Sequence, residues 1–112
     1  MSRLQQIEAM LADEPGDPFL TYSLAMELRR EGEFEKSLSR FDELIAGNPP
    51  HIQAMFMSAQ MLADRGQIED ARTRLRDGID EARRQGNHHA AGEMSELLAS
   101  LGQFGEDEED EL

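Results

Sequence analysis

A short pattern recurs in this chain at a nearly fixed spacing, and it constrains the fold more than any other feature of the sequence. Residues 28–34, 62–68 and 98–104 each read leucine, three further residues, glycine, one residue and then a large apolar side chain. The glycines Gly32, Gly66 and Gly102 lie 34 and then 36 residues apart. A fixed period of this length is typical of stacked repeats, in which each unit buries its apolar face against its neighbours. The sequence therefore predicts an array of repeats.

Within each repeat the apolar residues recur at helical spacing. Asp17 before Pro18 predicts a helix start, because an Asp side chain caps a first turn well and Pro fits inside it. Gly32 supplies the backbone freedom with which helices commonly end. A second helix then runs toward Pro49, which cannot continue the helical hydrogen bonds. The inward-facing positions of the two helices are Thr21, Leu24, Ala25, Leu28, Phe34, Leu38, Phe41, Leu44 and Ile45.

The same pattern divides the chain into two full repeats flanked by half repeats. We expect a half repeat over 2–14, repeats over 17–50 and 51–85, and a terminal capping helix over 87–101. Ser2 and Gln5 have the spacing of a capping box for the first helix, and Asn87 can cap the last. Residues 106–111 are all acidic. Like charges repel and bury no apolar area, so we expect residues 105–112 to form a disordered acidic tail.

A helix–turn–helix unit of 34 residues with these side chains resembles the tetratricopeptide repeat (TPR) family. In the first repeat the residues that match the family pattern are Gly32, Phe34, Ser37, Phe41 and Pro49. In the second repeat the matching residues are Ala59, Gly66, Ile68 and Ala71. The departures from the pattern are Gly78, Arg83, and Thr21 and Met55, which replace the family's early tryptophan. The resemblance implies an all-α fold, a right-handed α-solenoid of about six helices. A single lysine among eleven basic residues hints at a bacterial source with a GC-rich genome.

The charge of the chain argues against several classes of partner. The chain carries 24 acidic and 11 basic residues, a formal net charge of −13 at pH 7. Nucleic acids and anionic membranes are recognised through clustered Lys and Arg, so we expect neither as a partner. The first residues hold no apolar run long enough for a signal peptide, and no segment is long enough to span a membrane. We therefore expect a cytoplasmic protein.

Patterns of catalytic and metal-binding residues are missing from the sequence. Cysteine is absent, no Gly-rich phosphate loop is present, and Lys36 is the only lysine. No serine lies in a Gly-x-Ser-x-Gly turn. His88 and His89 are neighbours, which diverge by about 100° on a helix and cannot face one metal ion together. Even the spacing of His89 and Glu93 offers only two ligands, too few for a good site. We expect no enzymatic activity, no cofactor and no metal site.

The resemblance places candidate binding residues on the first helix of each repeat, because these helices line the concave side of TPR arrays. The expected partner-binding residues are Phe19, Tyr22, Met26, Arg29, Arg30, Phe56, Met57 and Gln60. Met and aromatic side chains accept apolar anchors, and clusters of them usually mark interaction sites. The expected function is that of a non-enzymatic adaptor or chaperone-like cofactor, which binds a peptide or helix of a partner protein in this concave groove. Two alternatives stay open: the same side chains pack in the core of a short array, or they form a homodimer interface in a homo-oligomeric assembly protein.

Overall fold

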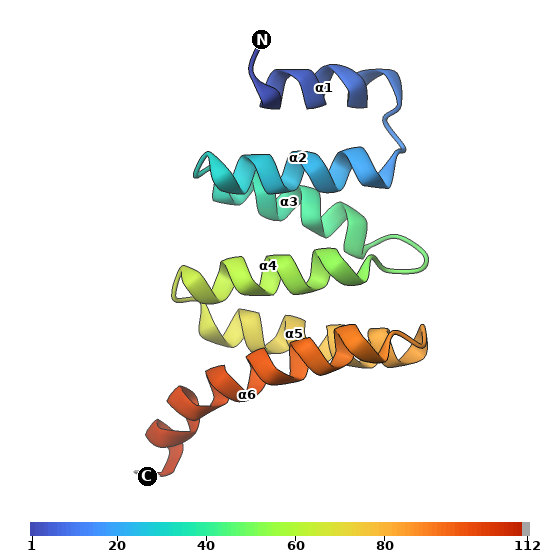
Figure 1. Ribbon diagram of the computed structural model, residues 1–112. Helices are drawn as coiled ribbons and strands as arrows, with labels where there is room; N and C mark the ends of the chain where they lie inside the picture. Colours follow the sequence, from blue (N-terminus) through green and yellow to red (C-terminus); the bar gives the residue numbers. More distant parts are fainter. Residues whose placement is uncertain (111–112) are drawn as a thin grey trace. The chain divides into compact units, whose positions relative to one another are not determined.

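The protein is built from α-helices. The computed structural model describes the backbone of residues 1–110 and the side chains of residues 1–102. The helices are α1 (Arg3–Asp13), α2 (Pro18–Arg30), α3 (Phe34–Ile45), α4 (Ile52–Asp64), α5 (Ile68–Arg84) and α6 (His88–Asp110) (Figure 1). No strand is present in residues 1–110, and the predicted all-α class is confirmed. Helices α2 and α3 lie within the predicted first repeat, 17–50, and α4 and α5 lie within the predicted second repeat, 51–85.

The side chains that were expected to cap helices do so. The Ser2 hydroxyl accepts from the Gln5 N–H at 3.1 Å, and the Gln5 side chain accepts from the Ser2 N–H at 3.1 Å. Asp17 accepts from the N–H two residues on, at 2.8 Å, and Asn87 from the N–H three residues on, at 3.1 Å. Each cap pairs N–H groups that have no partner inside the helix. Capping therefore sets the starts of α1, α2 and α6.

Three glycines make the same turn. Gly32, Gly66 and Gly86 have φ angles of 80°, 80° and 76°, in the left-handed region that favours glycine. In each turn the glycine N–H donates to the carbonyl three residues back, and the next N–H donates to the carbonyl five residues back. This pair of bonds is the Schellman motif of helix C-termini. The turns at Gly32 and Gly66 were expected from the repeat, whereas the turn at Gly86 was not.

The chain divides into two compact units, Met1–Ala54 and Met55–Leu112, where the sequence predicts one continuous repeat domain. The division falls inside α4, three residues after its start. In a helical repeat each helix contacts mainly its neighbours, so such a chain has few long-range contacts to bind it into one body.

In the first unit, α2 packs against both α1 and α3 (Figure 1). Ile7 and Leu11 of α1 meet Leu24 and Leu28 of α2 in one buried cluster. Between α2 and α3 the fully buried Ser37 donates a hydrogen bond of 2.6 Å to the carbonyl of Ala25. A small side chain at this position lets the two backbones approach closely.

In the second unit, α5 packs along α6 (Figure 1). Arg74 of α5 donates to the hydroxyl of the buried Ser58 of α4 at 3.1 Å. Gly78 of α5 lies directly against the fully buried Met94 of α6: a Cβ atom on Gly78 would be 2.6 Å from the Met94 sulfur. The departure from the TPR pattern at Gly78 therefore makes room for a large side chain of α6.

The last helix differs from the prediction. The capping helix was expected to end at Leu101, whereas α6 runs to Asp110. The disorder expected for residues 105–112 stays a prediction. No proline follows Gly102, a single glycine such as Gly105 costs a helix only about 1 kcal/mol, and glutamate is a good helix former. The part of the predicted tail at residues 111–112 lies outside the described residues.

Candidate functional site

The expected binding residues of the first repeat form one line along α2. Phe19, Tyr22, Met26 and Arg29 follow the i, i+3, i+7, i+10 spacing that places side chains on one helix face. Phe19 is 72% exposed, a high value for a large apolar side chain. Tyr22, Met26 and Arg29 are half-buried, and the neighbouring Arg30 is exposed. This face of α2 thus combines an exposed phenyl ring with partly exposed Tyr and Met side chains.

Tyr22 also packs within the first unit. Its ring meets the fully buried Phe41 edge to face, with centroids 6.1 Å apart, and stacks on His51 at 5.4 Å. Burial raises the pKa of Tyr22 above its ordinary 10.0, while a hydrogen bond with the Gln53 side chain and the charge of Arg29 oppose that rise. One side of this ring therefore holds α2, α3 and the segment before α4 together.

His51 caps α4, a role that we did not predict for it. Its Nδ1 accepts a hydrogen bond of 3.0 Å from the N–H of Ala54. Burial lowers the pKa of His51 below its ordinary 6.5, and a hydrogen bond of the ring with the backbone of His51 itself opposes this shift. The signal was present in the sequence, since residues 49–51 offer no Ser, Thr, Asn or Asp before a helix that needs a cap. His51 is the acceptor that remains.

The expected binding residues of the second repeat lie on α4 and are half-buried. These are Phe56, Met57 and Gln60. Phe56 and Gln60 are four residues apart and share a face, whereas Met57 follows Phe56 and points about 100° away. No expected binding residue in either repeat belongs to the buried core.

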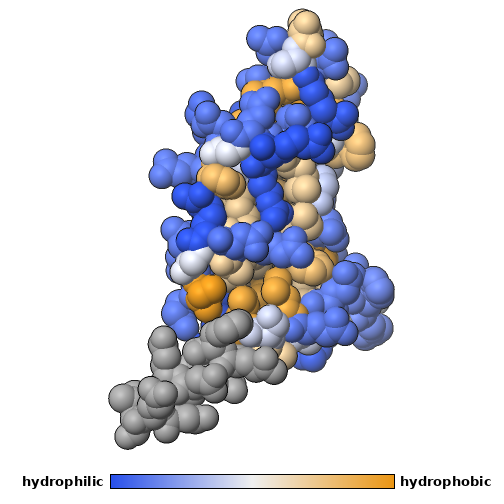
Figure 2. Space-filling view, turned by 60° about the vertical axis from the view of Figure 1, so that its left-hand side comes forward, coloured by the Kyte–Doolittle hydropathy of each residue, from blue (hydrophilic) through white to orange (hydrophobic). Residues whose placement is uncertain are grey.

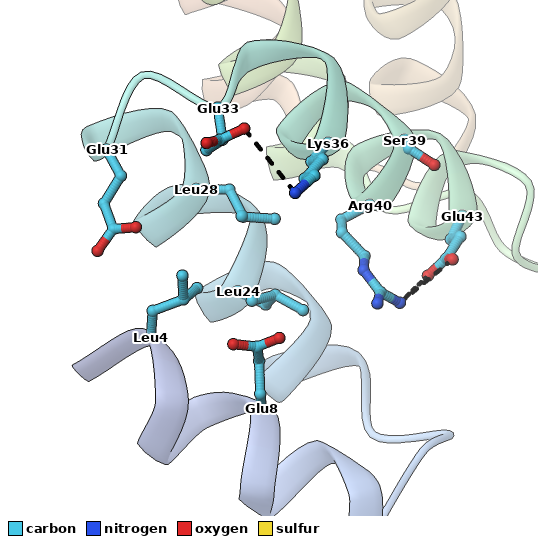
Figure 3. Close-up of a pocket in the computed structure, with 10 residues that line it drawn as sticks. All are labelled: Leu4, Glu8, Leu24, Leu28, Glu31, Glu33, Lys36, Ser39, Arg40 and Glu43. Atoms are coloured by element: carbon cyan, nitrogen blue, oxygen red, sulfur yellow. Dashed lines mark hydrogen bonds and ion pairs between the residues drawn. The ribbon is translucent and has the colours of Figure 1, made fainter. Parts of the chain in front are cut away.

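A pocket of about 470 Å³ lies elsewhere in the first unit, between α1 and α3 and against one face of α2 (Figure 3). Its apolar lining comes from Leu4, Leu24 and Leu28. Its polar lining comes from Glu8, Glu31, Glu33, Lys36, Ser39, Arg40 and Glu43. No short sequence pattern predicts it, because its lining joins helices that are far apart along the chain.

Several of the remaining charged groups are paired with neighbours on the same helix. Arg72 lies 3.3 Å from Glu69, and Arg84 lies 2.8 Å from Glu81, as expected for an outer helix with interleaved charges. Figure 2 shows one face of the molecule, on which hydrophilic residues cover most of the surface. His89 lies 2.9 Å from Glu93. Within the described residues, no three His, Asp or Glu side chains are grouped so that they could hold a metal ion.

In the part of the chain that the structure describes, no helix combines the length and apolar character that crossing a membrane requires.

Comparison with solved structures identifies the fold. Protein BPP2914 from Bordetella parapertussis is similar with a TM-score of 0.79 and 20% identity, over 92% of this chain and 90% of that protein. A tetratricopeptide repeat domain protein from Salinibacter ruber is similar with a TM-score of 0.73 and 24% identity, over 78% of this chain and 88% of that one. The chain has a TPR-like fold. No protein-family model matches the sequence, and no curated protein does.

The two surfaces lie on different faces of the first unit. The line from Phe19 to Arg29 lies on α2, the first helix of a repeat, where we expected the binding residues. The pocket instead lies between α1 and α3, which both hold second-helix positions, and against one face of α2. One unit therefore carries two separate candidate surfaces.

Proposed function

We propose that the chain is a non-enzymatic protein-interaction module that binds a peptide or helix of a partner protein through the first helices of its repeats. The exposure of Phe19 is the observation that carries this proposal. A phenyl ring that is 72% exposed leaves apolar area in water that a partner would bury. Helical repeats commonly bind partners through surfaces of this kind.

The neighbours of Phe19 add both adaptability and charge. Met26 is flexible and partly exposed, so it can adjust to apolar side chains of different shapes. Arg30, beside Arg29 at the end of the same helix, is exposed and favours an acidic group on the partner. The proposed ligand is therefore a segment with an apolar anchor for Phe19 and Met26 and an acidic residue beyond it. Phe56, Met57 and Gln60 are proposed as the corresponding contacts on α4.

Tyr22 is a poor residue with which to test the proposal. Its contacts with Phe41 and His51 mean that a change at Tyr22 weakens the fold as well as the surface. Phe19 has no such double role, because most of its side chain is exposed. Met10 on α1 is 50% exposed and offers a matched control: an apolar residue that lies outside the proposed surface.

The test uses peptides selected from a displayed random library against the whole chain, with binding measured by fluorescence anisotropy. We expect Phe19→Glu to weaken binding by about tenfold, as loss of a central aromatic contact does. Met10→Glu should change it by less than about twofold. Equal losses in the two variants, or no loss in Phe19→Glu, would contradict the proposed surface.

The homo-oligomer alternative uses the same surface and is separated by light scattering at several concentrations. If Phe19 contacts a second copy of the chain, the wild type is a dimer and Phe19→Glu is a monomer. If Phe19 contacts a different protein, both are monomers.

A further inference from the structure

The pocket of the first unit has an apolar floor and a charged rim. Leu24 and Leu28 of α2 form the floor, and Leu4 of α1 closes one side (Figure 3). The two floor residues belong to the buried core, so the floor is held in place by the packing of α1 on α2. Its volume of about 470 Å³ is within the range of sites that hold several side chains or a small molecule.

The two cations at the rim are already paired. Lys36 lies 4.0 Å from Glu33, and Arg40 lies 3.4 Å from Glu43, each within one turn of α3. The rim has two further carboxylates, Glu8 of α1 and Glu31 at the end of α2. Neither has an ion-pair partner among the described residues.

This distribution of charge favours a basic ligand with an apolar side chain. With Lys36 and Arg40 paired, the rim presents two carboxylates without an ion-pair partner among the described residues, Glu8 and Glu31, beside the apolar floor (Figure 3). An apolar side chain inserted between α1 and α3 would contact the partly buried Leu4 at the edge of the floor, and flanking Lys or Arg side chains would reach Glu8 and Glu31. A net charge of −13 on the whole chain also attracts a basic segment toward this rim.

We propose that this pocket is a second docking site, which binds a basic amphipathic segment of a partner protein. The segment inserts an apolar side chain between α1 and α3 and pairs its basic residues with Glu8 and Glu31. A second copy of this chain is a poor occupant, because two chains of this charge repel each other. The site goes beyond the proposed function, since it lies on other helix faces and takes a ligand of opposite charge.

The test measures binding of a labelled amphipathic peptide of leucine, alanine and lysine to the whole chain by fluorescence anisotropy. The double variant Glu8→Gln/Glu31→Gln removes the two unpaired carboxylates. Its control is Glu14→Gln/Glu35→Gln, which makes the same change in net charge at two exposed residues outside the pocket. We expect the pocket variant to weaken binding about three- to tenfold, because exposed ion pairs contribute little each, and the control to weaken it less than twofold.

A second variant tests the cavity without changing the charge. Ser39 lines the pocket and is exposed, so Ser39→Trp fills the space from its edge and leaves the core residues in place. Ser100 is an exposed serine of α6, and Ser100→Trp is the matched control. Peptide binding that is lost in Ser39→Trp but kept in Ser100→Trp supports the site. Circular dichroism of every variant confirms that the helices remain.

NMR of the leucine methyl groups locates the peptide. Shifts at Leu4, Leu24 and Leu28 that saturate with the peptide support the proposal. Equal weakening by the two double variants, or equal binding of a peptide with glutamate in place of lysine, would overturn it. Shifts confined to the α2 face of Phe19 and Met26 would also overturn it, while leaving the proposed function intact. Loss of peptide binding in Phe19→Glu but not in Ser39→Trp would likewise overturn the pocket proposal and leave the proposed function intact.

Discussion

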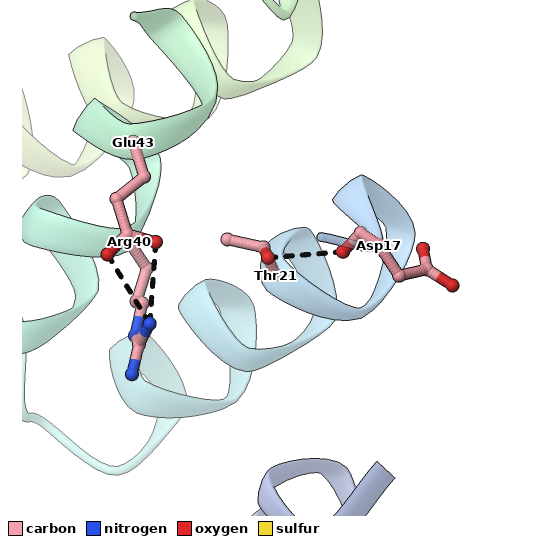
Figure 4. A network of polar contacts seen from close by, with 4 residues as sticks. All are labelled: Asp17, Thr21, Arg40 and Glu43. Atoms are coloured by element: carbon pink, nitrogen blue, oxygen red, sulfur yellow. Dashed lines mark hydrogen bonds and ion pairs between the residues drawn. The ribbon is translucent and has the colours of Figure 1, made fainter. Parts of the chain in front are cut away.

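The two repeats have an arginine at equivalent positions, and the two arginines make different contacts. Arg40 of α3 and Arg74 of α5 are 34 residues apart, and so are Leu24 and Ser58 on the first helices. In the second repeat Arg74 donates to the Ser58 hydroxyl at 3.1 Å and joins α5 to α4. In the first repeat Leu24 offers no acceptor, and Arg40 lies 3.4 Å from Glu43 instead (Figure 4). We therefore expect the first-helix residue, Leu24 or Ser58, to determine whether the arginine connects two helices or lines a pocket.

A second pair of equivalent positions differs in volume. Leu44 of α3 is buried, and its equivalent 34 residues later is Gly78 of α5. The sulfur of Met94 in α6 takes up the space beside Gly78. Protein interiors are packed to a nearly constant density, so the volume missing from one helix is supplied by another. The equivalent space is therefore filled by Leu44 of α3 in the first repeat and by Met94 of α6 in the second.

Leu24→Ser gives the first repeat the residue of the second, and we expect it to have the largest effect. Leu24 is 2% exposed, and loss of a buried leucine side chain costs about 3 kcal/mol. Urea unfolding followed by circular dichroism measures the cost. The new hydroxyl is placed to accept from Arg40, so Arg40→Ala should destabilise the Leu24→Ser protein more than the wild type. Equal effects of Arg40→Ala in both backgrounds would show that the Arg74–Ser58 arrangement does not transfer.

Gly78→Leu makes the converse exchange, since it gives the second repeat the residue of the first. Even a Cβ atom at this position lies 2.6 Å from the buried Met94 sulfur, so a leucine overpacks the contact of α5 with α6. We expect a loss of about 2 kcal/mol in the free energy of unfolding. Gly92→Leu on α6 is the control, because no atom lies near its Cβ position. A Gly78→Leu protein as stable as the control would mean that Met94 moves aside freely.

Ser37→Ala tests the small residue between α2 and α3. Its equivalent in the second repeat is Ala71, which has no hydroxyl, so only the first repeat has a hydrogen bond here. We expect a loss of about 1 kcal/mol, the usual net value of such a bond. Thermal unfolding of Ser37→Ala and of Ser39→Ala, an exposed position on the same helix, measures it. A melting temperature that falls equally in the two variants would assign no stability to the hydrogen bond.

Features that depend on neighbours along the chain could be predicted from the sequence. The caps at Ser2, Asp17 and Asn87 and the turns at Gly32 and Gly66 each involve residues within five positions of one another. They therefore appear as short patterns with a direct physical cause. The all-α class followed from the same patterns and from the period.

Features that depend on side-chain directions across helices could not be predicted. The stacking of Tyr22 on His51 joins residues 29 positions apart, and the period says nothing about which way either ring points. The pocket needs Leu4 and Arg40 on the same side of α2, which depends on how α1 and α3 cross it. The end of α6 was missed for another reason, because an acidic run repels itself and yet glutamate favours the helix.

His51→Asn should have the smallest effect, and one that depends on pH. His51 accepts through Nδ1, so its neutral form caps α4, and its pKa in the folded protein is below the ordinary 6.5. The stability from this cap is complete above pH 6.5, and it is lost as the pH falls from 6.5 through the lower folded-state pKa, because the unfolded chain then binds the proton more tightly.

Asparagine also caps helices but does not titrate, so His51→Asn keeps an acceptor at every pH. Urea unfolding of both proteins between about pH 5 and pH 7.5 gives the difference in their free energies of unfolding, from which the groups common to both cancel. The wild type should lose stability relative to the variant as the pH falls below 6.5. The lost stacking on Tyr22 shifts the variant by a constant amount and leaves this slope unchanged. Parallel pH profiles would show that the neutral imidazole does not hold the start of α4, and the first turn of that helix would then depend on packing alone.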